Sequence, residues 1–170
     1  MREVSDAFLL NMAEVTAALV GLFLVGVFFF VEAGFHRATG ALDPYFRSGT
    51  RIVLIVFAIP LLLSMTLVVM EPVWSHILFA LLSLLLIAAN VDSLRLVWGV
   101  RGTSLTLLIN ELAGTATVPF IVALPWILGG IDPSREDLTW SILLAFLTGF
   151  LSVSTLVLSA YDLPRTDRSD

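Results

Sequence analysis

The stretch from Ala7 to Val31 constrains this chain most, because it is almost wholly apolar. A helix of that length crosses the ~30 Å hydrocarbon core of a bilayer, so the sequence predicts a transmembrane helix here. Two polar residues, Asn11 and Glu14, lie inside this stretch. A carboxyl group within a membrane is energetically costly, so any interpretation of function has to account for Glu14.

Composition extends the membrane prediction to the whole chain. Its 170 residues are 58% hydrophobic and 14% charged, whereas soluble domains contain about half apolar and a quarter charged residues. We therefore expect residues 1–170 to form a single transmembrane domain. The absence of cysteine excludes disulfides and thiolate metal sites. A net charge of −5 argues against nucleic acid as a partner.

Apolar segments of spanning length recur along the sequence. We predict transmembrane helices at about 7–31, 52–70, 73–98, 104–128 and 138–161, followed by a short polar tail over 162–170. Pro60 falls in the middle of the second span and predicts a kink, because proline removes a backbone hydrogen bond. Ser64 and Thr66 can satisfy a carbonyl freed in this way.

Three acidic residues followed by proline indicate helix starts. An acid that caps the helix and a proline in its first turn are typical of helix N-termini, and this pattern occurs at Asp43-Pro44, Glu71-Pro72 and Asp132-Pro133. We expect the second, third and fifth helices to begin there. Gly129-Gly130 is predicted to end the fourth helix.

The distribution of arginine predicts the orientation in the membrane. With the N-terminus outside, only Arg2 and Arg135 lie on the outer side, and the cytoplasmic side receives Arg37, Arg47, Arg51, Arg95, Arg101, Arg165 and Arg168. Aromatic residues agree, with Trp74, Trp126 and Trp140 at outer helix ends and Tyr45, Trp98 and Tyr161 at inner ends. The predicted fold is all-α, a polytopic bundle of five transmembrane helices in the cell (cytoplasmic) membrane, N-terminus outside and C-terminus cytoplasmic. The absence of lysine is explained by a GC-rich or halophilic genome, and we expect a prokaryotic source.

Polar residues within the spans form the candidate site. Glu14 shares a helix face with Ala18, Gly21 and Val25, whose small members favour close helix approach, so we expect Glu14 to point into the bundle. Asp92 and Arg95, three residues apart, are expected to pair at the interface. The proposed intramembrane polar or ion site consists of Asn11, Glu14, Asn90, Asn110 and Glu111.

Three interpretations of the buried acids stay open. In the first, Glu14 and Glu111 hold or relay a proton or small cation, since burial makes a carboxyl exchangeable near neutral pH. In the second, each is a protonated acid that hydrogen-bonds a neighbouring helix, an interaction worth ~0.6 to 2 kcal/mol in membranes. In the third, they lie close enough to the interface to be solvated, since Glu14 is roughly 10 Å from the start of its span at 1.5 Å per residue.

Small and hydroxyl residues recur on the fifth helix at alternating spacings of four and three. Such a pattern usually indicates a close-packing surface, and less often an oligomer interface or a hydroxyl-lined pore. We predict a helix-packing seam that combines these residues with one small residue of the first helix, Gly21. The residues of the fifth helix in this seam are Ser141, Ala145, Thr148, Ser152, Thr155 and Ser159.

Two functions from different classes remain. The sequence contains no His-Glu-x-x-His, Gly-x-Ser-x-Gly or Gly-rich phosphate motif, and its two histidines, His36 and His76, are predicted on opposite sides of the membrane, so we expect no enzyme, metal or cofactor. The first hypothesis is channel- or transporter-like movement of a proton or small cation through buried Glu and Asn residues of an oligomer. The alternative is a non-catalytic assembly or accessory subunit whose polar residues only pack helices. Expected partners are the lipid bilayer and either further copies of the chain or another membrane protein.

Overall fold

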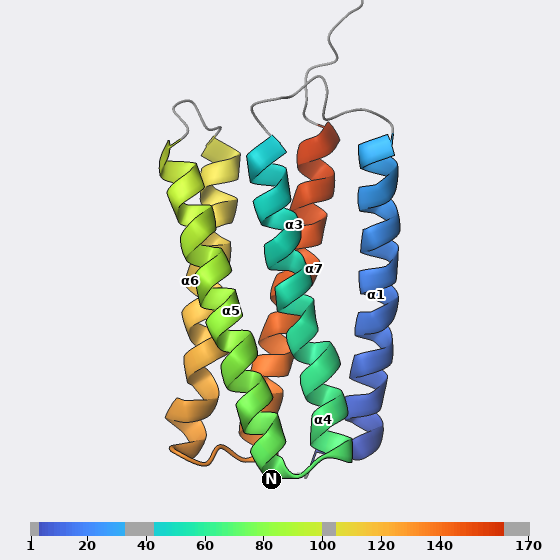
Figure 1. The fold of residues 1–170 in the computed structure, drawn as a ribbon, viewed down its shortest axis with the longest axis vertical. Helices are drawn as coiled ribbons and strands as arrows, with labels where there is room; N and C mark the ends of the chain where they lie inside the picture. The colour runs from blue at the N-terminus through green and yellow to red at the C-terminus, as the bar shows by residue number, and fades with distance from the viewer. Residues whose placement is uncertain (1–3, 33–42, 100–104, 162–170) are drawn as a thin grey trace, which may run out of the picture.

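The described part of the chain folds into long helices joined by short connections. The computed structural model describes residues 4–32, 43–99 and 105–161, and these ranges contain helices and no strands. In chain order the helices are α1 (Asp6–Glu32), α3 (Asp43–Ala58), the π-helix η1 (Ile59–Leu63), α4 (Ser64–Val69), α5 (Pro72–Gly99), α6 (Leu105–Gly129) and α7 (Arg135–Tyr161). Because α3, η1 and α4 follow one another without a break, they form one continuous rod (Figure 1).

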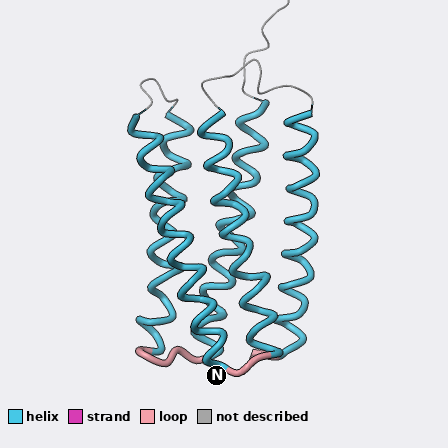
Figure 2. Tube along the Cα trace, in the orientation of Figure 1, coloured by secondary structure: helices cyan, strands magenta, loops and turns pink. Residues whose placement is uncertain are grey.

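The rods stand side by side and alternate in direction (Figures 1 and 2). α7 packs against α6 and α3, and α5 packs against α3 and α6, so these elements form a central bundle. α1 lies at one edge and packs against the bundle mainly through η1 and α4. One side of α1 therefore faces away from the rest of the chain.

Four helical segments of the described ranges are long and apolar enough to cross a membrane, namely Asp6–Phe29, Gly49–Val69, Pro72–Arg95 and Arg135–Ser154. A shorter apolar segment, Thr115–Gly129, belongs to α6. Large apolar side chains cover the outer surface, for example Leu22, which is 70% exposed, and Phe120, which is 64% exposed. Surface of this kind is stable against lipid rather than water, so the fold is that of a helical membrane protein.

The core lies where the second rod meets α5, α6 and α7. Its fully buried members come from every rod and include Leu9, Ile59, Leu63, Phe79, Leu86, Ile121 and Ile142. A second, smaller cluster forms around Phe23, Val53 and Phe57 and joins α1 to α3. Close packing supplies much of the cohesion here, because lipid chains are as apolar as the core and the hydrophobic effect does not drive helices together within a bilayer.

Pro60 changes the helix around it, at the position where the sequence predicts a kink. Proline has no backbone N–H to donate, and the chain accommodates this missing hydrogen bond with a π-helical turn over Ile59–Leu63. Thr66 Oγ1 donates to the Leu63 carbonyl at 3.0 Å, and not to the Val56 carbonyl that Pro60 leaves without its donor. The other predicted hydroxyl, Ser64 Oγ, is buried and has no hydrogen-bond partner among the described residues.

The connection from α6 to α7 confirms one predicted boundary and corrects another. α6 ends at Gly129, and Gly130 has a φ of +70°, a left-handed conformation that glycine adopts without strain. The prediction that Asp132-Pro133 starts the last helix is wrong, because α7 begins at Arg135. Ser134 is its cap: the Ser134 N–H donates to Asp137 Oδ2 at 2.9 Å, and the Asp137 N–H donates to Ser134 Oγ at 3.3 Å.

Candidate functional site

The candidate site lies on the outer face of α1, and it arises from the way α1 packs. The inner face of this helix is formed by Leu9, Ala13, Thr16 and Phe23, which are all buried. Thr16 satisfies its own hydroxyl by donating to the Met12 carbonyl at 2.6 Å. These spacings of three, four and seven residues define one helix face, so the residues between them point away from the bundle.

The outward residues of α1 follow a heptad pattern. Spacings of three and four alternate along one stripe, and every member is exposed. We call this stripe the outer seam of α1, and it consists of Asn11, Glu14, Ala18, Gly21, Val25 and Phe28. A strict three–four alternation is the pattern by which one helix packs against another over several turns, so the outer seam has the form of a helix-pairing surface.

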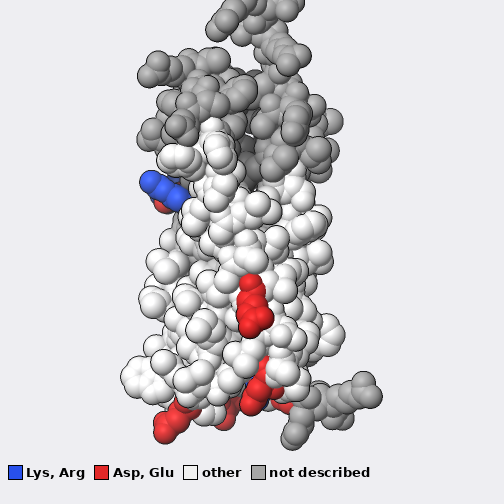
Figure 3. All heavy atoms as spheres, turned by 90° about the vertical axis from the view of Figure 1, so that its right-hand side faces the viewer, with Lys and Arg blue, Asp and Glu red and all other residues white. Residues whose placement is uncertain are grey.

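Glu14 lies on this outer seam and is exposed. Figure 3 looks onto the side of the molecule where α1 lies and shows acidic atoms surrounded by uncharged side chains, well above the acidic end of the molecule. The expectation that Glu14 points into the bundle of its own chain is therefore wrong. The small residues that share its face, Ala18 and Gly21, were correctly grouped with it, but the bundle packs against the opposite face, where Leu9 and Thr16 lie.

The polar groups of the outer seam have no partner within the described chain. No hydrogen bond or ion pair joins Asn11 or Glu14 to any residue whose side chain the structure describes. Glu14 lies about 12 Å along α1 from Asp6, at 1.5 Å per residue, so it is well inside the segment that is apolar enough to span a membrane. The seam thus presents an amide and a carboxyl to lipid.

Space beside the outer seam is open. A Cβ atom added at Gly21 would meet nothing within 4 Å, and the same is true of Gly26, which lies on α1 outside the seam. Gly21 was predicted to belong to a helix-packing seam, and no helix in the described part of the chain packs against it. The two glycines are therefore a matched pair for testing whether anything else does.

Asn90 lies in a different part of the molecule and has a structural partner. It is buried on α5, where its Oδ1 accepts a hydrogen bond from Thr115 Oγ1 of α6 at 3.2 Å. α1 lies at one edge of the bundle, and α5 and α6 lie at the other (Figure 1). The structure thus does not bring Glu14 and Asn90 together. Of the remaining predicted site residues, Asn110 and Glu111 have side chains outside the described part of the chain.

The predicted seam of α7 packs inside the chain where it is described. Ser141 Oγ donates to the Ile121 carbonyl of α6 at 2.6 Å, and Ala145 is fully buried. Thr148 is buried and Ser152 is half-buried, whereas the side chains of Thr155 and Ser159 lie outside the described residues. Close packing between α6 and α7 is thus the role of the described half of this seam.

Contacts at the end of the bundle where α1 begins tie the helices together. His76 Nε2 lies 2.9 Å from the Pro133 carbonyl, and its Nδ1 lies 3.8 Å from Asp132 Oδ1, so α5 contacts the α6–α7 connection. The Arg135 guanidinium pairs with Asp6 and joins the start of α7 to the start of α1. This ion pair was not predicted, since nothing in the spacing of two residues so far apart in sequence indicates contact.

The described residues hold no cluster of three or more His, Cys, Asp or Glu side chains that could bind a metal ion. The chain matches no protein-family model, and no curated protein or solved structure resembles it significantly.

Proposed function

We propose that this chain is a non-catalytic membrane assembly subunit that associates with a second copy of itself through the outer seam of α1. The observation that carries the proposal is the exposure of Asn11 and Glu14 on a membrane-spanning helix. Strongly polar side chains at the centre of a spanning helix cost on the order of 2.5–3.5 kcal/mol on insertion scales. A second helix that hydrogen-bonds these groups removes part of that cost, so association is favoured over exposure to lipid.

A second copy suits the seam better than an unrelated helix does, because its polar groups lie at the right depth. Two copies inserted in the same orientation present Asn11 and Glu14 at equal depth. In a parallel pair related by a two-fold axis, the amide N–H of Asn11 can donate to the carboxyl oxygen of Glu14 one turn along the other helix. A single Asn in a heptad seam is also a feature that fixes register and oligomeric state in helix pairs.

The rest of the seam is compatible with close approach. Ala18 and Gly21 follow Glu14 at spacings of four and three, and small residues at such positions let two helix backbones come together in membranes. Val25 and Phe28 extend the seam with apolar surface that is 52% and 63% exposed. Association would therefore bury polar groups at one end of the seam and apolar groups at the other.

We propose that the chain crosses the cell membrane five times, with its N-terminus outside and its C-terminus in the cytoplasm. The distribution of arginine supports this orientation. Trp74, Trp126 and Trp140 support the placement of the spans, because they lie near helix ends that meet where α1 begins, and tryptophan is enriched at membrane interfaces.

The proposal is tested by measuring association in liposomes with Gly21→Leu and its matched control, Gly26→Leu. A Cβ atom at either position meets no described atom within 4 Å, so we expect both variants to fold like the wild type. Donor- and acceptor-labelled copies are mixed at decreasing protein-to-lipid ratios, and energy transfer is recorded. We expect transfer in the wild type and Gly26→Leu and its loss in Gly21→Leu. Equal transfer in both variants, or none in the wild type, would contradict the proposal.

A second candidate function is movement of a proton or small cation along the surface shared by copies. The position of Glu14 favours this form of the transport hypothesis over a path within one chain, because copies that meet at the outer seam bring their carboxyls together. Proton flux into liposomes loaded with a pH-sensitive dye tests it. Flux that disappears in Glu14→Gln but persists in Glu71→Gln, an exposed acid between α4 and α5, supports transport. If proton flux does not exceed that of empty liposomes while association is intact, transport is excluded and only the assembly function remains.

A further inference from the structure

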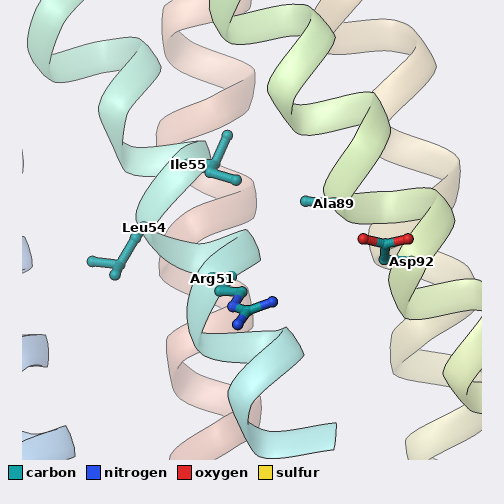
Figure 4. Close-up of a pocket in the computed structure, with 5 residues that line it drawn as sticks. All are labelled: Arg51, Leu54, Ile55, Ala89 and Asp92. Carbon is teal, nitrogen blue, oxygen red and sulfur yellow. The ribbon is translucent and has the colours of Figure 1, made fainter. Parts of the chain in front are cut away.

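A groove between α3 and α5 lies far from the outer seam and has charges of both signs at its mouth. It has a volume of about 350 Å³ and is lined by Arg51, Leu54, Ile55, Ala89 and Asp92. Figure 4 shows Arg51 extending from α3 toward the part of α5 that carries Ala89 and Asp92. Its volume is within the range of small-molecule sites, about 300–1,000 Å³.

Neither charge at this groove is neutralised by a strong contact. No ion pair or hydrogen bond joins Arg51 to another residue in the described part of the chain. Asp92 lies 4.0 Å from Arg95 on the same helix, and both side chains are more than two-thirds exposed. An exposed pair at that distance contributes little, so Arg51 and Asp92 are free to contact a ligand.

The charged and the apolar lining residues lie at different levels along the helices, as the headgroup and the acyl chains of a lipid do. Arg51 lies about two turns after the start of α3 (Asp43–Ala58), and Asp92 lies about two turns before the end of α5 (Pro72–Gly99), so both charges lie toward the same end of the bundle. Leu54, Ile55 and Ala89 lie about one turn deeper in the membrane. A ligand in the groove would thus meet charge nearer the helix ends and apolar surface about one turn further in.

We propose that this groove binds a phosphatidylethanolamine-class lipid. The lipid phosphate contacts the Arg51 guanidinium, whose planar donors suit phosphate oxygens, and the primary ammonium contacts the Asp92 carboxylate. One acyl chain lies against Leu54, Ile55 and Ala89.

The same residues discriminate against the other common headgroups. Phosphatidylglycerol carries the phosphate without an ammonium, so it gives Asp92 no cationic partner beyond the weak contact with Arg95. Phosphatidylcholine carries a quaternary ammonium that cannot donate a hydrogen bond, and proteins recognise such groups with aromatic side chains, of which the groove has none among its lining residues. We therefore expect a preference for phosphatidylethanolamine over both.

Native mass spectrometry of the full chain, released from nanodiscs of defined lipid mixtures, tests the site. In equal mixtures we expect the wild type to retain phosphatidylethanolamine over phosphatidylglycerol by about tenfold, the effect of one charge-assisted hydrogen bond. Asp92→Asn should abolish that preference, and Arg51→Gln should weaken retention of both lipids, while Arg51→Lys keeps the charge and restores part of it. Glu71→Gln, at the other end of α5, serves as the control and should behave like the wild type.

Two results would overturn the proposal. One is equal retention of the three lipids by the wild type. The other is an unchanged preference in Asp92→Asn when circular dichroism shows a folded variant. Soluble phosphoethanolamine, which lacks acyl chains, should fail to displace the lipid at millimolar concentration; displacement would assign the site to a free headgroup compound instead. Because the site does not involve α1, its failure would leave the assembly function untouched.

Discussion

Gly149 provides the sharpest test of how the helices pack. It lies on α7 against the ring of Phe57 on α3, and a Cβ atom added there would be 2.8 Å from Cε1 and 3.0 Å from both Cδ1 and Cζ of that ring. Phe57 is 1% exposed and packs edge-on against Phe146 at a centroid distance of 6.5 Å, so the ring has little room to move. Replacing Gly149 with alanine should therefore push α7 and α3 apart.

The magnitude follows from two opposing effects. Overpacking a close-packed interior costs about 1–3 kcal/mol. Alanine is favoured over glycine within a helix by about 1 kcal/mol, which offsets part of that cost. We expect Gly149→Ala to lower the free energy of unfolding by about 1 kcal/mol net, whereas Gly21→Ala, where nothing lies within 4 Å, should not lower it.

Reversible unfolding in mixed detergent micelles, followed by circular dichroism, measures both variants. Phe57→Leu in the Gly149→Ala background should relieve the clash, so the double variant should be more stable than the sum of the two single changes predicts. If Gly149→Ala is as stable as Gly21→Ala and shows no coupling to Phe57→Leu, the close approach of α7 and α3 described here is refuted.

Three further perturbations can be read by the same unfolding measurement. Ser141→Ala removes the hydroxyl that donates to a carbonyl of α6, and it should cost ~0.6 to 2 kcal/mol, the value of an interhelical hydrogen bond in a membrane; an unchanged stability would show that the bond is not made. Thr115→Val and Asn90→Leu should each destabilise, and the double change should cost less than their sum because they remove one shared bond; strict additivity would contradict the contact. Asp6→Asn should lower the free energy of unfolding by less than about 1 kcal/mol, and the effect should disappear in high salt, since the ion pair of Asp6 with Arg135 is partly exposed. A larger cost that does not depend on salt would contradict a partly exposed ion pair.

Helix positions were largely predictable from the sequence, because length and apolarity alone identify a spanning helix. The predicted segment 7–31 falls within α1, and 73–98 falls within α5. Local chemistry was predictable for the same reason: the Gly129-Gly130 break and the Asp92–Arg95 pair depend on neighbours in sequence. The start of α7 was misplaced because Ser134, which caps as well as an aspartate does, stands after the proline and forms the capping hydrogen bonds.

The orientation of α1 could not be predicted from the sequence. In a soluble protein the apolar face of a helix identifies its inner side, but both faces of α1 are apolar, so periodicity does not distinguish lipid from bundle. Glu14 was assigned to the inside because it shares a helix face with the small residues Ala18 and Gly21, which favour close approach of another helix. No described residue of the chain pairs with Glu14, so a partner for its carboxyl would have to come from another molecule. The ion pair between Asp6 and Arg135 could not be predicted either, because these two residues are far apart in sequence.

Site-specific crosslinking tests the central claim most directly, because the chain contains no cysteine of its own. Gly21→Cys places a thiol on the outer seam, and Gly26→Cys places one elsewhere on the same open helix. A disulfide forms only when two Cα atoms come within about 4.4–6.8 Å, so oxidation in native membranes reports close helix pairing. We predict a crosslinked dimer for Gly21→Cys and a monomer for Gly26→Cys. Crosslinking of neither variant, or of both equally, would contradict the pairing of α1 with a second copy.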